Sequence, residues 1–217
     1  MKYKQKPAKH KSSDTVLVID VASTCWKDRK SMTAENPKMR HSIIEVAATP
    51  ISIKDLTIGD TEDFIIKPKQ DNSVSRFCTE ITGITQEMCD NGTTLKKCFA
   101  SLKEKFVQKE APIVATFGMY DIKMIKYQIE RFKLKYPFNS GFMDLRRLVS
   151  ITLGLPRDVS LSEAMKAAGV PFTAGRAKRA LHNSQDAARL IVDVWSRARE
   201  CASKKKIVLY QKILSIN

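Results

Sequence analysis

The sequence predicts a single α/β domain in which strands come first and helices follow. Runs rich in β-branched and apolar residues occupy residues 15–20, 42–48 with a continuation at 51–56, and 61–67. A further apolar run at residues 113–117 stands between segments whose apolar residues recur at helical spacing. This order favours one sheet that is covered by helices on both faces.

The individual elements follow from the same patterns. The opening runs are expected to form an antiparallel meander, and helices are expected at residues 95–106, 120–133, 161–168 and 184–200. Asp144 is a further acid at the entry to a helix. The domain is expected to span residues 14–200. A basic flexible arm at 1–13 should precede it, and a basic and then apolar tail at 201–217, which could form a last helix packed on the domain, should follow it.

Charge and cysteine usage narrow the class of protein. Thirty-eight Lys and Arg residues against 23 Asp and Glu give a net charge of +15, which favours a polyanionic partner, above all nucleic acid. A solubilising surface is the alternative. No apolar run approaches the roughly 18 residues that span a membrane. We therefore expect no membrane anchor. None of the five cysteines forms a CxxC pair, and we expect reduced thiols in a cytoplasmic protein.

Acidic residues stand where two-metal phosphodiester hydrolysis would need them. Asp20 ends the first strand, and Asp121 begins a helix after the turn at Gly118. A strand that carries acids at positions i and i+2 presents both to one face, and several converging carboxylates suit hard divalent cations. Ala22 occupies the i+2 position. His182 could act as a base because histidine titrates near neutral pH.

Five ordered segments carry a resemblance to a known family. They are Asp20-Val-Ala-Ser-Thr-Cys-Trp26, Ile43-Ile-Glu-Val-Ala47, Phe77-Cys-Thr-Glu-Ile-Thr-Gly-Ile-Thr-Gln86, Ala115-Thr-Phe-Gly-Met-Tyr-Asp121, and His182 followed five residues later by Ala187. Together they resemble the histidine subclass (DEDDh) of the DEDD 3′–5′ exonucleases, and most closely its Eri-1 and three-prime histone-mRNA exonuclease branch. The resemblance extends from about residue 15 to residue 199.

The resemblance implies an RNase H-like α/β fold with a mixed five-stranded sheet, and two Mg²⁺ or Mn²⁺ ions. Asp20 would bind both ions, Asp121 would bind the second, and His182 would be the general base. In a His-x4-Asp motif the acid follows the histidine by five residues, where Ala187 stands. Ala22 and Ala187 are therefore expected to be emptied ligand positions, where the family has Glu and Asp.

The resemblance also implies substrate contacts. Ser23 and Thr24 would touch the terminal nucleotide through backbone and hydroxyl groups. Phe77 and Ile84 would stack on bases or wedge between them. The basic residues Arg176 and Arg179 precede His182, and both are expected to lie along the substrate path.

The expected function is a metal-dependent 3′–5′ exonuclease that acts on single-stranded or 3′-end RNA or DNA. We interpret the alanines at positions 22 and 187 as substitutions that inactivate an otherwise intact nuclease. Two alternatives stay open: a natural pseudonuclease that binds ends without cleaving them, and a proofreading-type exonuclease subunit. The motifs identify no protein partner.

Overall fold

The computed structural model describes residues 14–28, 30–32, 41–68, 73–107, 111–138, 141–173 and 178–214, with side chains up to residue 202. The basic arm expected at 1–13 and Arg176 lie outside the described residues.

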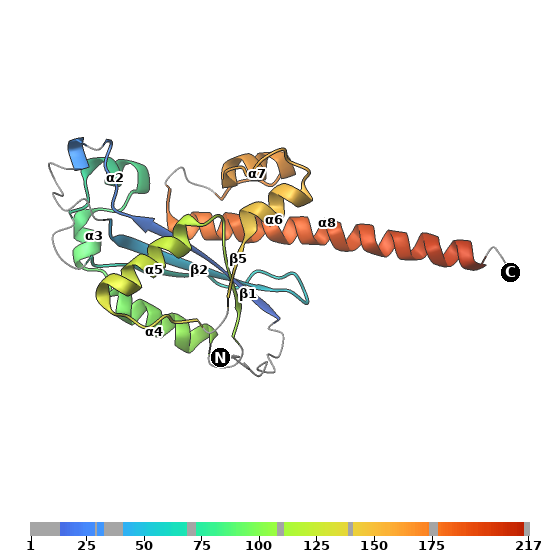
Figure 1. The fold of residues 1–217 in the computed structure, drawn as a ribbon, viewed down its shortest axis with the longest axis horizontal. Helices are drawn as coiled ribbons and strands as arrows, with labels where there is room; N and C mark the ends of the chain where they lie inside the picture. Colours follow the sequence, from blue (N-terminus) through green and yellow to red (C-terminus); the bar gives the residue numbers. More distant parts are fainter. Residues whose placement is uncertain are drawn as a thin grey trace, which may run out of the picture.

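A five-stranded mixed sheet forms the centre of the molecule, in the order β3-β2-β1-β4-β5 (Figure 1). Its strands are β1 (Thr15–Ser23), β2 (Ile43–Ser52), β3 (Glu62–Ile65), β4 (Ile113–Thr116) and β5 (Phe142–Asp144). The first three strands pair antiparallel, which confirms the expected meander. β4 pairs parallel with β1, and β5 pairs parallel with β4.

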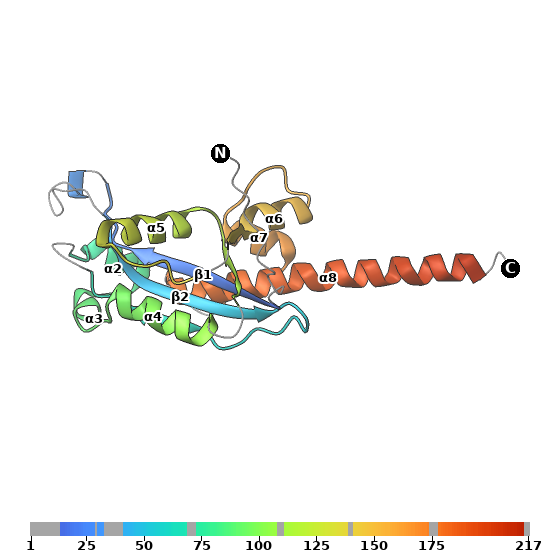
Figure 2. The same ribbon diagram turned by 60° about the horizontal axis from the view of Figure 1, so that its bottom comes forward.

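Seven helices surround the described sheet. They are α2 (Arg76–Thr82), α3 (Gln86–Asp90), α4 (Leu95–Phe106), α5 (Tyr120–Phe132), α6 (Leu145–Thr152), α7 (Leu161–Ala168) and α8 (Ala180–Leu214). Helices α4 and α5 pack on one face, and α6, α7 and α8 pack on the other (Figure 2). The Phe77–Gln86 motif forms α2, a turn and the start of α3, which cover the end of the sheet.

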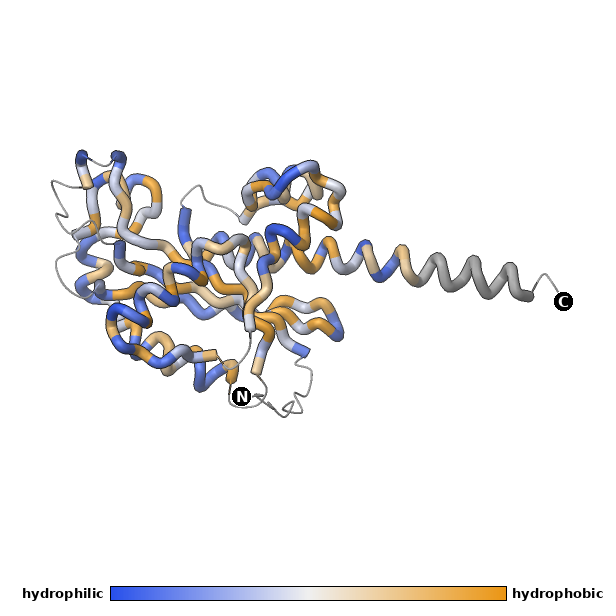
Figure 3. Tube along the Cα trace, in the orientation of Figure 1, coloured by the Kyte–Doolittle hydropathy of each residue, from blue (hydrophilic) through white to orange (hydrophobic). Residues whose placement is uncertain are grey.

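The side chains of β1 point alternately to the two faces of the sheet, and this alternation determines which face carries Asp20. Val16 and Val18 pack with the α6–α8 layer, whereas Leu17 and Ile19 pack with α4 and α5. Because side chains alternate along a strand, Asp20 lies on the α8 face of the sheet. Hydrophobic residues are spread along the strands and along the helices that pack on them (Figure 3).

Helix α8 begins four residues earlier than expected, at Ala180, and continues to Leu214 (Figure 1). The early start has a specific cause, because the backbone N–H of Ala180 donates to the Glu45 carboxylate at 2.7 Å. An acid from β2 thus supplies the acceptor that the first turn of a helix needs. The helix runs through residue 200 without a break, so residues 201–214 of the expected tail continue α8 rather than forming a separate last helix. Within the described part of the chain, no helix has the length and apolar character needed to cross a membrane.

Candidate active site

Asp20 and Asp121 meet at the end of β1. The backbone N–H of Val21 donates to Asp121 Oδ1 at 3.2 Å, which fixes the start of α5 against the strand. Burial raises the pKa of Asp121 to about 6, although this hydrogen bond acts in the opposite direction. Burial also raises the pKa of Asp20 well above its usual value, and the negative charge of Asp121 raises it further. The structure therefore brings the two acids together in a poorly hydrated place.

The residue of α8 that faces this acid pair is Asn183. Its side-chain nitrogen donates to Asp20 Oδ1 at 3.3 Å. Asn183 lies in the first turn of α8, where the helix crosses the end of β1. The helix thus presents an amide to Asp20 at the place where a late carboxylate was expected. The sequence patterns did not single out this residue.

Ala187 lies one helical turn further along and does not belong to the site. It is only 2% exposed and packs in the core cluster that contains Val16 and Val18. From Asn183 to Ala187 the helix advances by about 6 Å. On β1, Val18 is the residue before Asp20 on the same face, so Asn183 lies beside Asp20 whereas Ala187 lies in the cluster with Val18. The prediction that Ala187 is an emptied ligand position is therefore wrong, because its neighbours are the apolar residues of the core.

His182 also differs from its expected place. It lies inside the first turn of α8, half-buried, and its positive charge would act on Asp63 of β3, whose pKa it lowers. None of the interactions described for Asp20 involves His182. Lys178, five residues before Asn183, is exposed, and its backbone N–H donates to the carbonyl of Ile81 at 2.8 Å.

A buried ion pair stands beside Ala22. The register places Ala22 opposite Glu45, which is completely buried. Glu45 Oε1 accepts from Arg179 Nε at 2.5 Å, and Arg179 also reaches Asp63 at 3.2 Å. Both acids hold the guanidinium of Arg179 within the protein, and its contact with substrate stays a prediction. Burial, followed by the charge of Glu45, raises the pKa of Asp63 to about 6.

The substitution Glu45→Ala is expected to destabilise the fold by about 3 kcal/mol, because it leaves the Arg179 charge without its buried partner and removes the cap of Ala180. Urea unfolding measures the change in the free energy of unfolding. Glu80→Ala is the matched control, because Glu80 pairs with Arg76 in an exposed Arg–Glu pair. That control should change stability by less than about 1 kcal/mol. Equal losses for both variants would contradict the anchoring role of Glu45.

Two of the expected substrate contacts lie next to Asp20, and only one remains accessible. The Ser23 hydroxyl is 2.5 Å from the hydroxyl of Tyr120, at the exposed start of α5. Thr24 is completely buried, and its hydroxyl accepts from the N–H of Ser42 at 3.0 Å. Its backbone N–H donates to the Ser42 carbonyl, and its own carbonyl lies 2.6 Å from His41 Nδ1. The prediction for Thr24 is therefore wrong, because its polar groups are all engaged within the protein.

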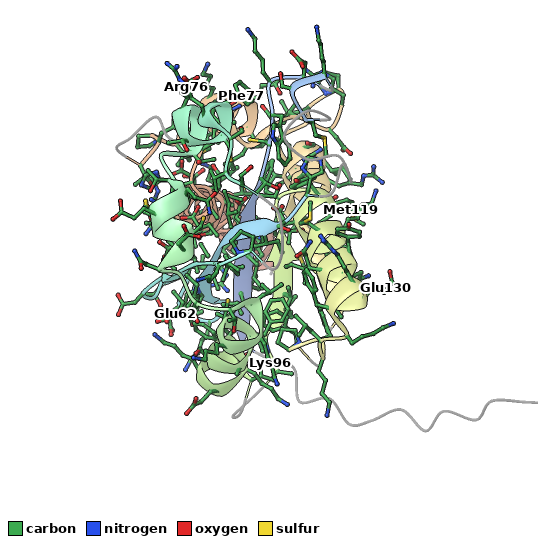
Figure 4. All side chains as sticks on the ribbon, turned by 90° about the vertical axis from the view of Figure 1, so that its left-hand side faces the viewer. Glu62, Arg76, Phe77, Lys96, Met119 and Glu130 are labelled. Atoms are coloured by element: carbon green, nitrogen blue, oxygen red, sulfur yellow. The ribbon has the colours of Figure 1, made fainter. Side chains whose placement is uncertain are left out.

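The two residues that were expected to stack on bases differ in their exposure. Ile84 has no exposed surface and packs beneath α2 with Ile44, so it cannot stack on a base, and that prediction is wrong. Phe77 is half-buried on α2. Figure 4 shows the end of the molecule where Phe77 and Met119 project from different elements. Met119 and Tyr120 are 40% and 52% exposed. Both residues add exposed apolar surface beside Asp121. In the sequence, the only sign of this surface was that they directly precede Asp121.

Arg146 is a charged neighbour of the acid pair that the sequence patterns missed. Its guanidinium donates to the Phe117 carbonyl at 3.3 Å, and its charge lowers the pKa of Asp121. The approach depends on Gly118, which has φ +103°, because an added Cβ would lie 2.1 Å from Arg146 Nη2. The only local signal was the position of Arg146 just after Asp144, the N-cap of α6.

Comparisons with known proteins agree with this architecture. A family model described as Exonuclease (RNase T) matches residues 17–194. The ERI1 exoribonuclease 2 of Xenopus laevis is 28% identical over 207 residues, which cover 85% of this chain and 29% of the relative. Human 3′-5′ exoribonuclease 1 is 28% identical over 187 residues, which cover 82% of this chain and 52% of the relative. The chain therefore spans less than two thirds of the length of both relatives.

Solved structures give the same result. The nuclease domain of 3′hExo, described as a DEDDh family member bound to rAMP, superposes with a TM-score of 0.74 at 26% identity, covering 87% of this chain and 94% of that one. A 3′-exonuclease described as recognising the 3′ end of a histone mRNA stem-loop superposes with a TM-score of 0.72 at 27% identity, covering 85% and 82%. These matches confirm the expected RNase H-like sheet. The chain belongs to the exonuclease family, in the Eri-1 branch of the DEDDh 3′–5′ exonucleases.

Proposed function

We propose that this chain binds the 3′ ends of single-stranded RNA without cleaving them. One observation carries the proposal: the side-chain amide of Asn183 donates to Asp20 where a carboxylate of α8 would complete an exonuclease site. The choice of RNA rests on relatives named as 3′-5′ exoribonucleases and on a related structure bound to rAMP.

The position of Asn183 changes the alignment of the late motif. If Asn183 holds the place of the acid in His-x4-Asp, then the place of the histidine falls on Lys178, five residues earlier. A lysine ammonium offers only hydrogen-bond donors, so it is unsuited to accept a proton from water. Together with Ala22, this leaves Asp20 and Asp121 as the two retained members of the five-residue set.

This pattern favours natural loss of cleavage over an inactivating pair of alanines. Asn183 keeps nearly the volume of an aspartate and exchanges a charge for a hydrogen-bond donor, which Asp20 uses. Alanine at position 187 needs no inactivation to explain it, because the core surrounds that residue. Of the alternatives that the sequence left open, the pseudonuclease is therefore the one we favour.

Features that support binding remain in place. The chain carries a net charge of +15, which attracts a phosphate backbone. Met119 and Tyr120 are exposed at the start of α5 beside Asp121, Lys178 is exposed just before α8, and Phe77 is half-exposed on α2. Exposed aromatic side chains provide surfaces on which the bases of single-stranded RNA can stack, whatever their sequence.

The test is to mix the chain with 5′-labelled single-stranded RNA and to measure anisotropy and length together. We expect saturable binding, a preference for linear over circular RNA of the same sequence, and no shortening in Mg²⁺. Tyr120→Ala should weaken binding by about tenfold, because it removes a stacking surface worth about 1–3 kcal/mol. Tyr127→Ala is the matched control, because Tyr127 is an exposed tyrosine two turns along the same helix. A ladder that shortens from the 3′ end and disappears with EDTA would refute the proposal.

A further inference from the structure

The acid pair of this chain offers a poor set of ligands to a divalent cation. Exonucleases of this family generally use divalent metals, and such ions need several converging oxygen ligands. Asp20 and Asp121 supply two carboxylates. Among the residues with described side chains, no group of three or more His, Cys, Asp and Glu residues is arranged to hold a metal ion. The expected two-ion centre therefore does not fit these residues.

The groups around Asp20 and Asp121 further disfavour the binding of a cation. Asn183 donates a hydrogen of its amide to Asp20 Oδ1, so the third side chain at this point is oriented as a donor. Asp121 Oδ1 already accepts from the N–H of Val21. Arg146 adds a positive charge beside Asp121, which opposes the entry of a cation.

A further acid whose charge acts on Asp20, Glu45, cannot make up the deficit. Glu45 lies opposite Ala22, but its two carboxylate oxygens accept from Arg179 and from the N–H of Ala180. Withdrawing Glu45 would break its ion pair with Arg179, leaving Asp63 as the remaining acid on that guanidinium, and would uncap α8. The same contact therefore fastens the helix and keeps this acid away from Asp20.

We propose that the Asn183–Asp20 hydrogen bond takes the place of the metal ions, so that the site is closed without a divalent cation and binds RNA independently of metal. This hydrogen bond joins β1 directly to the first turn of α8. The part of the inference that concerns RNA rests on the proposed function, whereas the part that concerns metal stands on the ligand geometry alone.

Titration of the full chain with Mn²⁺, followed by the electron paramagnetic resonance signal of the free ion, tests the metal part. The unaltered chain is expected to leave the signal unchanged at millimolar Mn²⁺. Asn183→Asp should lower the signal, with at least about tenfold tighter binding, because one more carboxylate faces the ion. Asp20→Asn in that background should abolish the gain. Mn²⁺ bound by the unaltered chain and released by Asp20→Asn would overturn the inference.

Anisotropy with 5′-labelled RNA in Mg²⁺ and in EDTA tests the other part. The dissociation constants are expected to agree within about twofold, because the contacts are with side chains rather than with an ion. Binding that requires Mg²⁺ would overturn the inference. If RNA fails to bind under either condition while Mn²⁺ also fails to bind, the proposed function is refuted and the metal-free site is supported.

Discussion

The triple variant Ala22→Glu, Lys178→His and Asn183→Asp is expected to shorten 5′-labelled RNA from its 3′ end in Mg²⁺. It returns the second acid of β1, a base that titrates near neutral pH, and the acid of α8 that faces Asp20. The expected gain in rate over the unaltered chain is at least about a thousandfold, which corresponds to roughly 4 kcal/mol of transition-state stabilisation. Denaturing gels show it as a ladder that disappears with EDTA.

Two further variants make this result decisive. Ala22→Glu with Ala187→Asp restores the acids at the positions that the sequence alone suggested and keeps His182; we expect no ladder from it. Ala22→Glu with Asn183→Asp keeps Lys178, and should cleave far more slowly than the triple variant because it lacks the base. Cleavage by the first pair, with none by the triple variant, would show that our alignment of the late motif is wrong.

The sequence was sufficient to identify Asp20 and Asp121, because the patterns that indicate these two acids are local. Asp20 lies near the end of an apolar strand, and Asp121 lies in the first turn of a helix just after the turn at Gly118. Both positions follow from patterns of a few residues, and the structure brings the two acids together. The strand meander and the main helices were predictable for the same reason.

On our proposed alignment, the sequence patterns misplace the late motif because its position depends on a contact between distant parts of the chain. Ala180 becomes the first residue of α8 by donating to Glu45, which lies 135 residues earlier. A shift of four residues rotates a helix by only about 40°, so the spacing of apolar residues hardly distinguishes Asn183 from Ala187. The histidine at position 182 then favoured the alignment that ends on Ala187 over the one that we propose, which ends on Asn183.

The burial of Thr24 and Ile84 was beyond sequence reasoning for a related cause. Each is buried because α2 and the neighbouring segments fold over the end of β1 and β2, where Ser75 also donates to the Cys25 carbonyl at 2.6 Å. A family motif indicates that such residues surround a site. It does not separate those that support the site from those that face the substrate.

The substitution Ala187→Asp is expected to destabilise the protein by about 3–5 kcal/mol at neutral pH. The new carboxylate would enter the apolar cluster around Val16 and Val18 without a partner, and a buried, unpaired charge carries a cost of this size. The free energy of unfolding in urea measures it. Because burial raises the pKa of such an acid, its protonated form predominates at lower pH, so the loss should be smaller near pH 4 than at pH 7.

Two controls separate this effect from the change of residue type. Ala198→Asp introduces the same side chain at an exposed position of α8 and should cost less than about 1 kcal/mol. Asn183→Asp places an acid one turn before Ala187, at the half-buried end of β1, and should cost clearly less than Ala187→Asp. If Ala187→Asp is tolerated as well as Ala198→Asp, position 187 has room for a solvated or ligated acid, and its place in the core is refuted. A large loss confined to Ala187→Asp places the lost acid of this helix at Asn183, because only there can a carboxylate reach Asp20 without entering the core.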